Sequence, residues 1–166
     1  NIVDILYAPL SSLEVSFSII LAAVTRSIVI GIVSAVVFFL IVDLKINNLV
    51  YIFFSAFFGS FFIGSLGFIT GLWATKFDHT ATITNFIITP LAFLSGVFYT
   101  IDKLPSIFQT ISYFNPFFHI INIFRYGFLG ASDGDISFGI IYLPILSLIG
   151  WFIAYILYKN GYKIKT

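Results

Sequence analysis

Long uncharged segments dominate this sequence and are broken only by short groups of charged residues. Residues 46–75, 80–101 and 136–158 contain no Asp, Glu, Lys, Arg or His, and residues 19–42 contain only Arg26. A helix needs roughly 20 mainly apolar residues to cross a hydrocarbon core about 30 Å thick. All four segments reach that length. We therefore predict an all-α membrane protein that crosses the bilayer several times.

The composition excludes a soluble domain. Hydrophobic residues make up 60% of the chain and charged residues 9%, whereas a soluble domain carries about 25% charged residues. The mean hydropathy is +1.08. The absence of cysteine excludes disulfides, thiol catalysis and cysteine metal ligands in this chain. Because the chain has no methionine and its first residues do not resemble a signal-peptide cleavage site, we expect a fragment that lacks N-terminal residues.

One transmembrane domain covering residues 1–166 is predicted, with residues 1–18 as a cytoplasmic interfacial segment. The predicted spans are residues 19–42, 50–75, 81–101 and 136–158. Residues 104–130 are also apolar, but Pro105, Asn115 and Pro116 divide them into two short pieces. Such pieces are typical of re-entrant or interfacial helices rather than of spans.

The charges that flank the spans predict the orientation of the chain, because cytoplasmic loops carry an excess of Lys and Arg. The C-terminal tail and the 76–80 loop are basic: Lys76, Lys159, Lys163 and Lys165. The opposite side mixes basic residues with aspartates: Lys45, Lys103, Arg125, Asp43, Asp102, Asp133 and Asp135. We therefore predict that both ends of the chain are cytoplasmic and that residues 43–49 and 102–135 face outside.

Small residues recur along one face of the second span. They are Ala56, Ser60, Gly64, Gly67, Gly71 and Ala74. Small residues at this spacing let transmembrane helices approach closely, so we interpret the stripe as a helix-packing face. The alternative is a sliding seam that opens a path for a substrate. In the third span, Pro90 is expected to produce a kink because its ring removes one backbone hydrogen bond.

One pair of glycines has the spacing of a phosphate-binding loop. Gly59 and Gly64 match the glycines of that motif, but Ser65 and Leu66 stand where the motif requires Lys and Ser or Thr. The pair also lies in the middle of a predicted span. We therefore expect that this chain does not bind ATP itself.

No catalytic or metal site is predicted. His79 and His119 lie on opposite sides of the membrane in the predicted topology, so they cannot share a metal ion. Asp133 and Asp135 are better explained by a polar turn before the last span than by a cation site. Arg26 is expected to extend to the membrane surface or to pair with an acid rather than to contact a substrate.

The most specific pattern lies between Thr89 and Gly130. It reads TPLAFLSGVFYTIDKLPSIFQTISYFNPFFHIINIFRYGFLG and combines TPL-x-FLSGVFY, LP, NP and RYGFLG. This combination resembles the C-terminal signature of the ABC-2 type exporter permeases, the membrane subunits of ATP-driven exporters. It is similar to the bacterial branch that includes polysaccharide, nodulation-factor and drug exporters. Because the segment Ala8-Pro9-Leu10-Ser11 is similar to the cytoplasmic segment before the family's third span, the resemblance covers the whole chain.

The resemblance implies roles for particular residues. Family members usually have six spans and cytoplasmic termini, so the four spans here would be the last four. The segment before the third span would form a coupling helix against the ATP-binding subunit: Asp4, Tyr7, Ala8, Pro9, Ser11, Ser12 and Glu14. Residues 104–130 would form two short helices that enter the membrane from outside and act as an external gate. The gate residues would be Phe98, Tyr99, Asn115, Pro116, His119, Arg125 and Gly130.

Arg125 is the charge most expected to act at this gate. It would pair with Asp102 or meet anionic groups of a substrate. A purely structural ion pair explains it equally well.

The leading hypothesis is the permease subunit of a bacterial exporter in the inner membrane. Its partners would be an ATP-binding subunit, which holds ATP and Mg, and a second permease copy, as a homodimer or pseudo-dimer among membrane lipids. No nucleic acid, bound cofactor or enzymatic activity is expected, and the substrate would be a glycan, a lipid-linked molecule or a drug-like compound. One alternative is a passive channel or scaffold. Another is a membrane enzyme acting on lipids or glycans, which would need a cluster of Asp, Glu or His at one membrane face.

Overall fold

The regular structure of the described residues is entirely helical, in agreement with the predicted all-α class. The computed structural model describes residues 10–42, 45–74, 77–98 and 100–161. In chain order the helices are α2 (Ser12–Ile41), α3 (Leu49–Trp73), α4 (Phe77–Ile83), the π-helical turn η1 (Thr84–Ile88), α5 (Thr89–Phe93), the 3₁₀ turn η2 (Ile101–Lys103), α6 (Ser106–Phe114), α7 (Pro116–Leu129) and α8 (Ile136–Lys159).

Three of these helices are long and apolar enough to cross a membrane. They are α2, α3 and α8, with 30, 25 and 24 residues, and they contain the predicted spans 19–42, 50–75 and 136–158 apart from a residue or two at their ends. The first helix begins at Ser12, seven residues before the predicted span. At about 1.5 Å per residue, 30 residues measure about 45 Å, which exceeds the thickness of a hydrocarbon core. Helix α2 is therefore long enough to cross a hydrocarbon core at a tilt.

The predicted span 81–101 is a helix with a π-helical turn, and it ends earlier than expected. Residues 77–93 form α4, η1 and α5 in continuous succession, and residues 94–98 form a turn with Gly96 at φ 77°. The π-helical turn ends just before Pro90, where the backbone N–H of Thr89 donates to the carbonyl of Thr84, five residues back. Proline cannot donate to the carbonyl four residues before it, so the helix widens by one residue there. That this segment crosses the bilayer stays a prediction.

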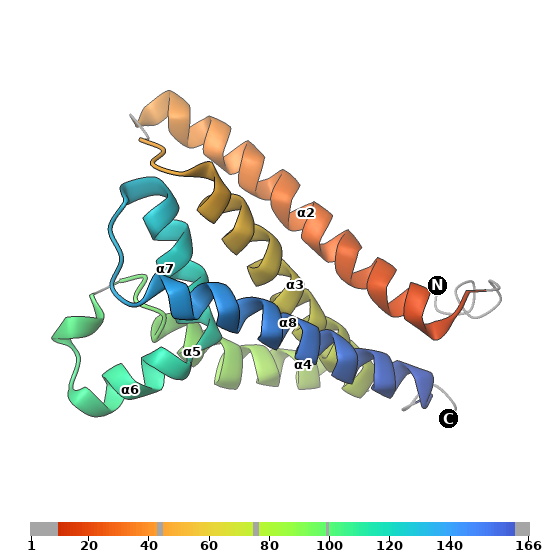
Figure 1. Cartoon of the computed structure of the whole chain (residues 1–166). Helices are drawn as coiled ribbons and strands as arrows, with labels where there is room; N and C mark the ends of the chain where they lie inside the picture. Colours follow the sequence, from red (N-terminus) through yellow and green to blue (C-terminus); the bar gives the residue numbers. More distant parts are fainter. Residues whose placement is uncertain (1–9, 43–44, 75–76, 99, 162–166) are drawn as a thin grey trace.

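Helix α3 occupies the centre of the bundle and packs against α2, α7 and α8 (Figure 1). A small apolar core of Ile20, Val24 and Phe61 joins the N-terminal half of α2 to α3. The ring of Phe17 in α2 lies 5.9 Å from that of Trp151 in α8. The C-terminal half of α2 diverges from the bundle, and Leu40 near its end is 83% exposed.

The close contacts of α3 fall mainly on residues beside the predicted small-residue stripe. Ser55, Gly59 and Ser65 are buried, and the Ser55 hydroxyl donates to the carbonyl of Ile120 in α7 at 2.6 Å. Of the predicted stripe, Gly64 lies against Ala23 of α2, whereas Gly67 has no atom within 4 Å of the place a Cβ would occupy. Gly71 is open in the same way. Within this chain, therefore, the stripe supplies only part of the helix-packing face of α3.

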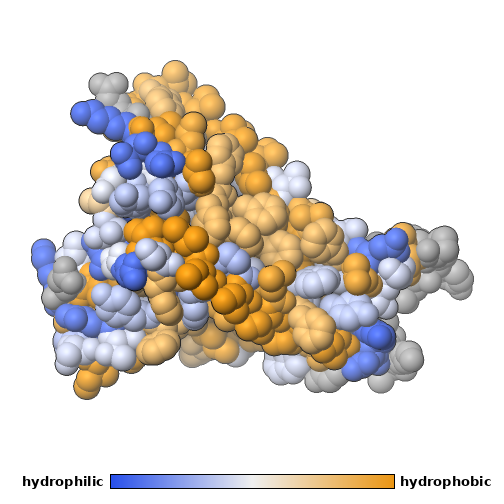
Figure 2. Space-filling model, viewed as in Figure 1, coloured by the Kyte–Doolittle hydropathy of each residue, from blue (hydrophilic) through white to orange (hydrophobic). Residues whose placement is uncertain are grey.

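The outer surface of the bundle is apolar across its middle. Figure 2 shows hydrophobic side chains over the central part of the visible face and hydrophilic ones toward its ends. On α8, large apolar side chains at helical spacing are half exposed: Ile141, Ile145, Leu148 and Phe152. Soluble monomers rarely expose apolar patches larger than a few hundred Å². This surface fits contact with lipid or with another membrane subunit.

Helix α7 approaches the start of α3 closely at Gly127. Its carbonyl accepts the backbone N–H groups of Asn47 at 3.0 Å and Asn48 at 2.8 Å. A Cβ at Gly127 would lie 2.5 Å from a side-chain carbon of Ile52 and 3.0 Å from the Ile52 backbone nitrogen. We expect Gly127→Ala to destabilise the fold by about 1–3 kcal/mol, because the backbones of α3 and α7 must separate.

Gly67→Ala is the matched control, because it makes the same change in open space on α3. It should leave stability unchanged or raise it by up to about 1 kcal/mol, the helix preference of Ala over Gly. Thermal unfolding in detergent, followed by tryptophan fluorescence, measures both variants. Equal unfolding of the two would contradict the close contact of α3 with α7.

Candidate functional site

Helices α6 and α7 form a hairpin whose joint is Asn115. This residue ends α6 and caps α7: its side-chain oxygen accepts the N–H of Phe117 at 3.0 Å. Its side-chain nitrogen donates to the carbonyl of Leu91 in α5 at 2.6 Å. Pro116 occupies the first helical position, where its missing N–H has no helical partner to lose. The Asn-Pro pair therefore fixes the turn and ties it to α5.

Side chains also satisfy backbone carbonyls where the short helices end. The hydroxyl of Ser112 in α6 donates to the carbonyl of Leu94 at 3.1 Å, just after α5. The hydroxyl of Tyr142 in α8 donates to the carbonyl of Phe114, the last residue of α6, at 2.8 Å. The last carbonyls of a helix have no partner within that helix. These bonds join the hairpin to its neighbours: one acceptor lies just after α5, and the other lies at the end of α6.

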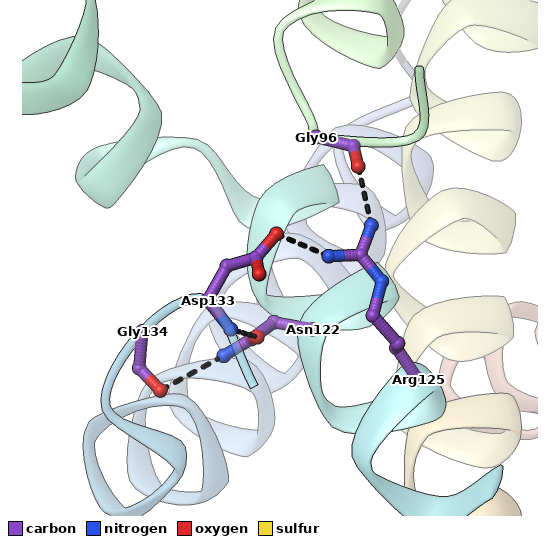
Figure 3. A network of polar contacts seen from close by, with 5 residues as sticks. All are labelled: Gly96, Asn122, Arg125, Asp133 and Gly134. Atoms are coloured by element: carbon purple, nitrogen blue, oxygen red, sulfur yellow. Dashed lines mark hydrogen bonds and ion pairs between the residues drawn. The ribbon is translucent and has the colours of Figure 1, made fainter. Parts of the chain in front are cut away.

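Arg125 connects three segments of the chain near the C-terminal end of α7 (Figure 3). One terminal nitrogen forms an ion pair with the carboxylate of Asp133, and the other donates to the carbonyl of Gly96. Asn122, one helical turn before Arg125, donates to the carbonyl of Gly134 at 3.2 Å. The Asn122 side-chain oxygen accepts the N–H of Asp133 at 2.8 Å. The network holds the 94–98 turn, α7 and the 130–135 loop together.

The predicted pairing of Arg125 with Asp102 stays a prediction. Asp133 forms the ion pair, and the side chain of Asp102 lies outside the part of the chain that the structure describes. The side chains of Arg125 and Asp133 are only 23% and 17% exposed, so water screens the pair less than it screens a surface ion pair. Asp135 caps α8 by accepting the N–H of Ser137 at 2.8 Å. In the predicted polar turn, therefore, the Asp133 carboxylate pairs with Arg125 and the Asp135 carboxylate caps α8.

His119 lies in an aromatic pocket inside the hairpin. It is 1% exposed, and its ring centroid lies 5.2 Å from that of Phe138 and 5.0 Å from that of Tyr142. Its Nε2 lies 2.7 Å from the carbonyl oxygen of Tyr113. Because a carbonyl only accepts, we assign the proton of the neutral ring to Nε2. Among the described atoms, Nδ1 then has no hydrogen-bond partner.

Burial lowers the pKa of His119 from its ordinary value of 6.5, and the bond to Tyr113 and the charge of Asp135 oppose that shift. The imidazole is therefore neutral at neutral pH. Protonation would place a charge and an unpaired N–H inside the hairpin.

The remaining predicted gate residues lie before and after the hairpin of α6 and α7. Phe98 is 73% exposed and stacks on Phe93, with ring centroids 5.5 Å apart. Gly130 ends α7 with φ 69° and packs against the side chain of Asn47. Tyr99 lies outside the described residues.

The predicted coupling segment is described only from Leu10 onward. Ser11 caps α2 and forms a capping box with Glu14: the Glu14 carboxylate accepts from the Ser11 N–H at 2.7 Å and from its hydroxyl at 2.8 Å. Ser12 is the first helical residue. The other residues assigned to coupling lie outside the described residues: Asp4, Tyr7, Ala8 and Pro9. Their role stays a prediction.

Three residues of the network at Arg125 were not predicted: Asn122, Gly96 and Asp133 as its ion-pair partner. Asn122 precedes Arg125 by three residues, so the two share one helical face. That spacing could have identified Asn122 in the sequence. In the described part of the chain, no group of three or more His, Asp and Glu residues is arranged to hold a metal ion.

Comparison with known proteins gives this arrangement a family context. Residues 1–129 match the sequence profile of a family described as ABC-2 type transporter. The chain is 30% identical over 155 residues to the inner membrane transport permease YadH of Escherichia coli K12. The aligned region covers 91% of this chain and 60% of that protein. Nodulation protein J of Rhizobium leguminosarum biovar trifolii is 33% identical over 90 residues, 54% of this chain and 34% of that protein. No solved structure matches.

The ion pair at Arg125 predicts energetic coupling between α7 and the 130–135 loop. We expect Arg125→Ala and Asp133→Ala each to lower stability by about 1–3 kcal/mol, because each leaves a partly buried charge unpaired. The double variant should lose less than the two single losses combined, with a coupling energy of about 0.5–3 kcal/mol. Thermal or denaturant unfolding of the four proteins measures the cycle. Strict additivity would contradict the pair, and Lys103→Ala provides a control for loss of a cation nearby.

The buried neutral imidazole predicts a loss of stability in acid. The folded-state pKa of His119 lies below 6.5. The contribution of the neutral imidazole to folding stability is therefore present above pH 6.5 and is lost as the pH falls through the folded-state pKa. We expect the unfolding temperature to fall more for the native chain than for His119→Gln between about pH 7.5 and about pH 5. The glutamine variant keeps an N–H donor for the Tyr113 carbonyl. Parallel pH profiles of the two proteins would contradict this account.

Proposed function

Because this chain belongs to the ABC-2 type transporter family, we propose that it forms part of the membrane permease subunit of an ATP-driven exporter. The chain spans 60% of the length of the Escherichia coli permease that it matches. The relatives support a transport permease role rather than an enzymatic one. The ATP-driven activity, the substrate and the partners of the whole protein form the proposal.

The single observation that carries the proposal is the match of residues 1–129 to the family, over helices of the kind a permease needs. Three described helices are long and apolar enough to cross a bilayer. The relatives' names place transport permeases in an inner membrane. We propose the same location for this protein, with the start of α2 and the end of α8 on the cytoplasmic side.

We propose that a second permease copy completes the translocation path. The C-terminal half of α2 has few neighbours in this chain, and Val29, Val33 and Leu40 are more than half exposed. Between α2, α3 and α7 lies an apolar groove of about 170 Å³. An exposed apolar helix next to such a groove fits association with another apolar helix in the membrane. The substrate would be a glycan, a lipid-linked molecule or a drug-like compound.

ATP and Mg would be bound by a separate subunit and not by this chain. We propose that this subunit pushes on the segment before α2. The capping box at Ser11 and Glu14 fixes the start of α2 as regular helix, and a fixed end transmits a push along the axis better than a frayed end. In this proposal Glu14 positions the helix end. Its carboxylate bonds to Ser11 within this chain and not to the partner subunit.

The first test is purification of the full-length protein from its native membrane in mild detergent. We expect a near-stoichiometric subunit with a phosphate-binding loop and ATP hydrolysis by the complex. Substitution of the lysine of that loop should abolish hydrolysis while the complex persists. A preparation that lacks such a subunit in several mild detergents would contradict the exporter function and favour a passive channel or scaffold.

The capping box gives a sharper test of coupling. Glu14→Gln removes the charge but keeps a side chain that completes the box, whereas Glu14→Ala removes both. We expect Glu14→Ala to weaken the helix end and to reduce export per ATP hydrolysed. Glu14→Gln should behave like the native protein. If both variants lose export equally, the charge of Glu14 contacts the partner and the positioning role is wrong.

A further inference from the structure

An open pocket lies beside Arg125, near the C-terminal end of α7, and is separate from the apolar groove. Its volume is about 410 Å³. It lies between the 94–98 turn, the η2 turn, α7 and the 130–135 loop. Its lining includes Val97, Phe98, Lys103, Arg125 and Asp133. The pocket therefore adjoins the network that holds these segments together.

Among the charged side chains that the structure describes around this pocket, positive charges exceed negative ones by one, and the side chain of Asp102, next to Lys103, lies outside them. Arg125 and Asp133 form an ion pair and largely cancel each other. Lys103 lines the same pocket, is exposed, and makes no ion pair among the described residues. The lysine side chain ends in an ammonium group with one positive charge. A ligand that enters the pocket thus meets the excess positive charge of these described side chains.

Arg125 keeps donors for a ligand although it is already paired. Its guanidinium carries five N–H donors in one plane, and the structure assigns two bonds to it, to Asp133 and to Gly96. These two acceptors hold the group in place at the wall of the pocket. A held guanidinium loses little conformational entropy when it binds an anion, which favours recognition of phosphate or carboxylate.

The rim of the pocket is apolar. Val97 is 49% exposed and Phe98 73% exposed, and the stack of Phe98 on Phe93 supports the ring from behind. An exposed aromatic ring beside charged groups can pack against the apolar face of a sugar or against an alkyl chain while the charges hold an ionic group.

We propose that this pocket binds an anionic group, a phosphate or a carboxylate, through Lys103 and Arg125, with the attached sugar or alkyl portion against Val97 and Phe98. The anion is carried either by a membrane lipid or by a free solute. The binding does not depend on ATP. Only the further step, that the ligand is a transported substrate at the outer mouth, rests on the proposed function.

A single cysteine at Val97 measures the local field, because this chain has no cysteine of its own. Any cysteine in the rest of the full-length protein is first replaced by serine. Val97→Cys is then labelled with a sulfonated, anionic methanethiosulfonate and with a trimethylammonium, cationic one. We compare the ratio of the anionic to the cationic labelling rate with the same ratio for a small free thiol. One excess positive charge nearby should make the ratio at the cysteine about threefold to tenfold higher. A ratio equal to that of the free thiol would overturn the proposal.

The second step assigns the field to Lys103. Lys103→Gln in the Val97→Cys background should return the rate ratio to that of the free thiol, and Lys103→Arg should keep it raised. Lys45→Gln is the matched control: it removes an exposed lysine from the α2–α3 loop, outside the pocket. Equal effects of Lys103→Gln and Lys45→Gln would overturn the assignment, because the field would then be general. Lys103 is exposed, so its replacement should not impair folding.

The third step identifies the source of the anion. The Val97→Cys protein is labelled with a neutral reagent in nanodiscs of phosphatidylcholine, with or without inorganic phosphate, and in nanodiscs that contain phosphatidylglycerol. Slower labelling with phosphate supports a free solute, and slower labelling only with phosphatidylglycerol supports a lipid headgroup. In both cases Lys103→Gln should abolish the protection. Protection by neither probe would overturn the binding proposal.

These results are independent of the exporter test. If the pocket attracts and binds anions but no ATP-binding subunit accompanies the protein, the proposed function fails and the pocket stands. If the ATP-binding subunit is present and the labelling ratio equals that of a free thiol, only the pocket fails.

Discussion

The structure depends on a rule of the bilayer: backbone polar groups that leave water must find partners within the protein. The long helices meet this rule through their own hydrogen bonds. The short helices α5 and α6 end within the bundle and leave carbonyls open. Asn115 and Ser112 supply donors to carbonyls in and just after α5, and Tyr142 supplies one to the last carbonyl of α6. Polar side chains from α6, the turn and α8 therefore complete the backbone at the ends of α5 and α6 and hold the hairpin in place.

The sequence was sufficient for features that depend on local pattern. Uncharged runs identified α2, α3 and α8 because hydrocarbon selects for length and apolarity alone. The Asn115–Pro116 turn followed from the local backbone preferences of those two residues. The observed all-helical class and the family membership both agree with the predictions.

Features that depend on which helices meet were not predictable. Asp133 and Asp102 were equally available to Arg125 in sequence, and only the path of the 130–135 loop brings Asp133 to it. Helix α3 carries small residues on more than one face, so spacing could not reveal that Ser55 and Gly59 would face α7. Such contacts are fixed by the whole bundle and not by a local pattern.

The π-helical turn at Thr84–Ile88 affects how this helix should be compared between relatives. One added residue in a turn rotates everything after it by about 100° relative to a regular helix. A relative with one residue deleted here could keep α5 and the 94–98 turn in place with an unbroken helix. An alignment gap at this position would then mean that the relative has a regular α-helix here, and not that it has lost a function.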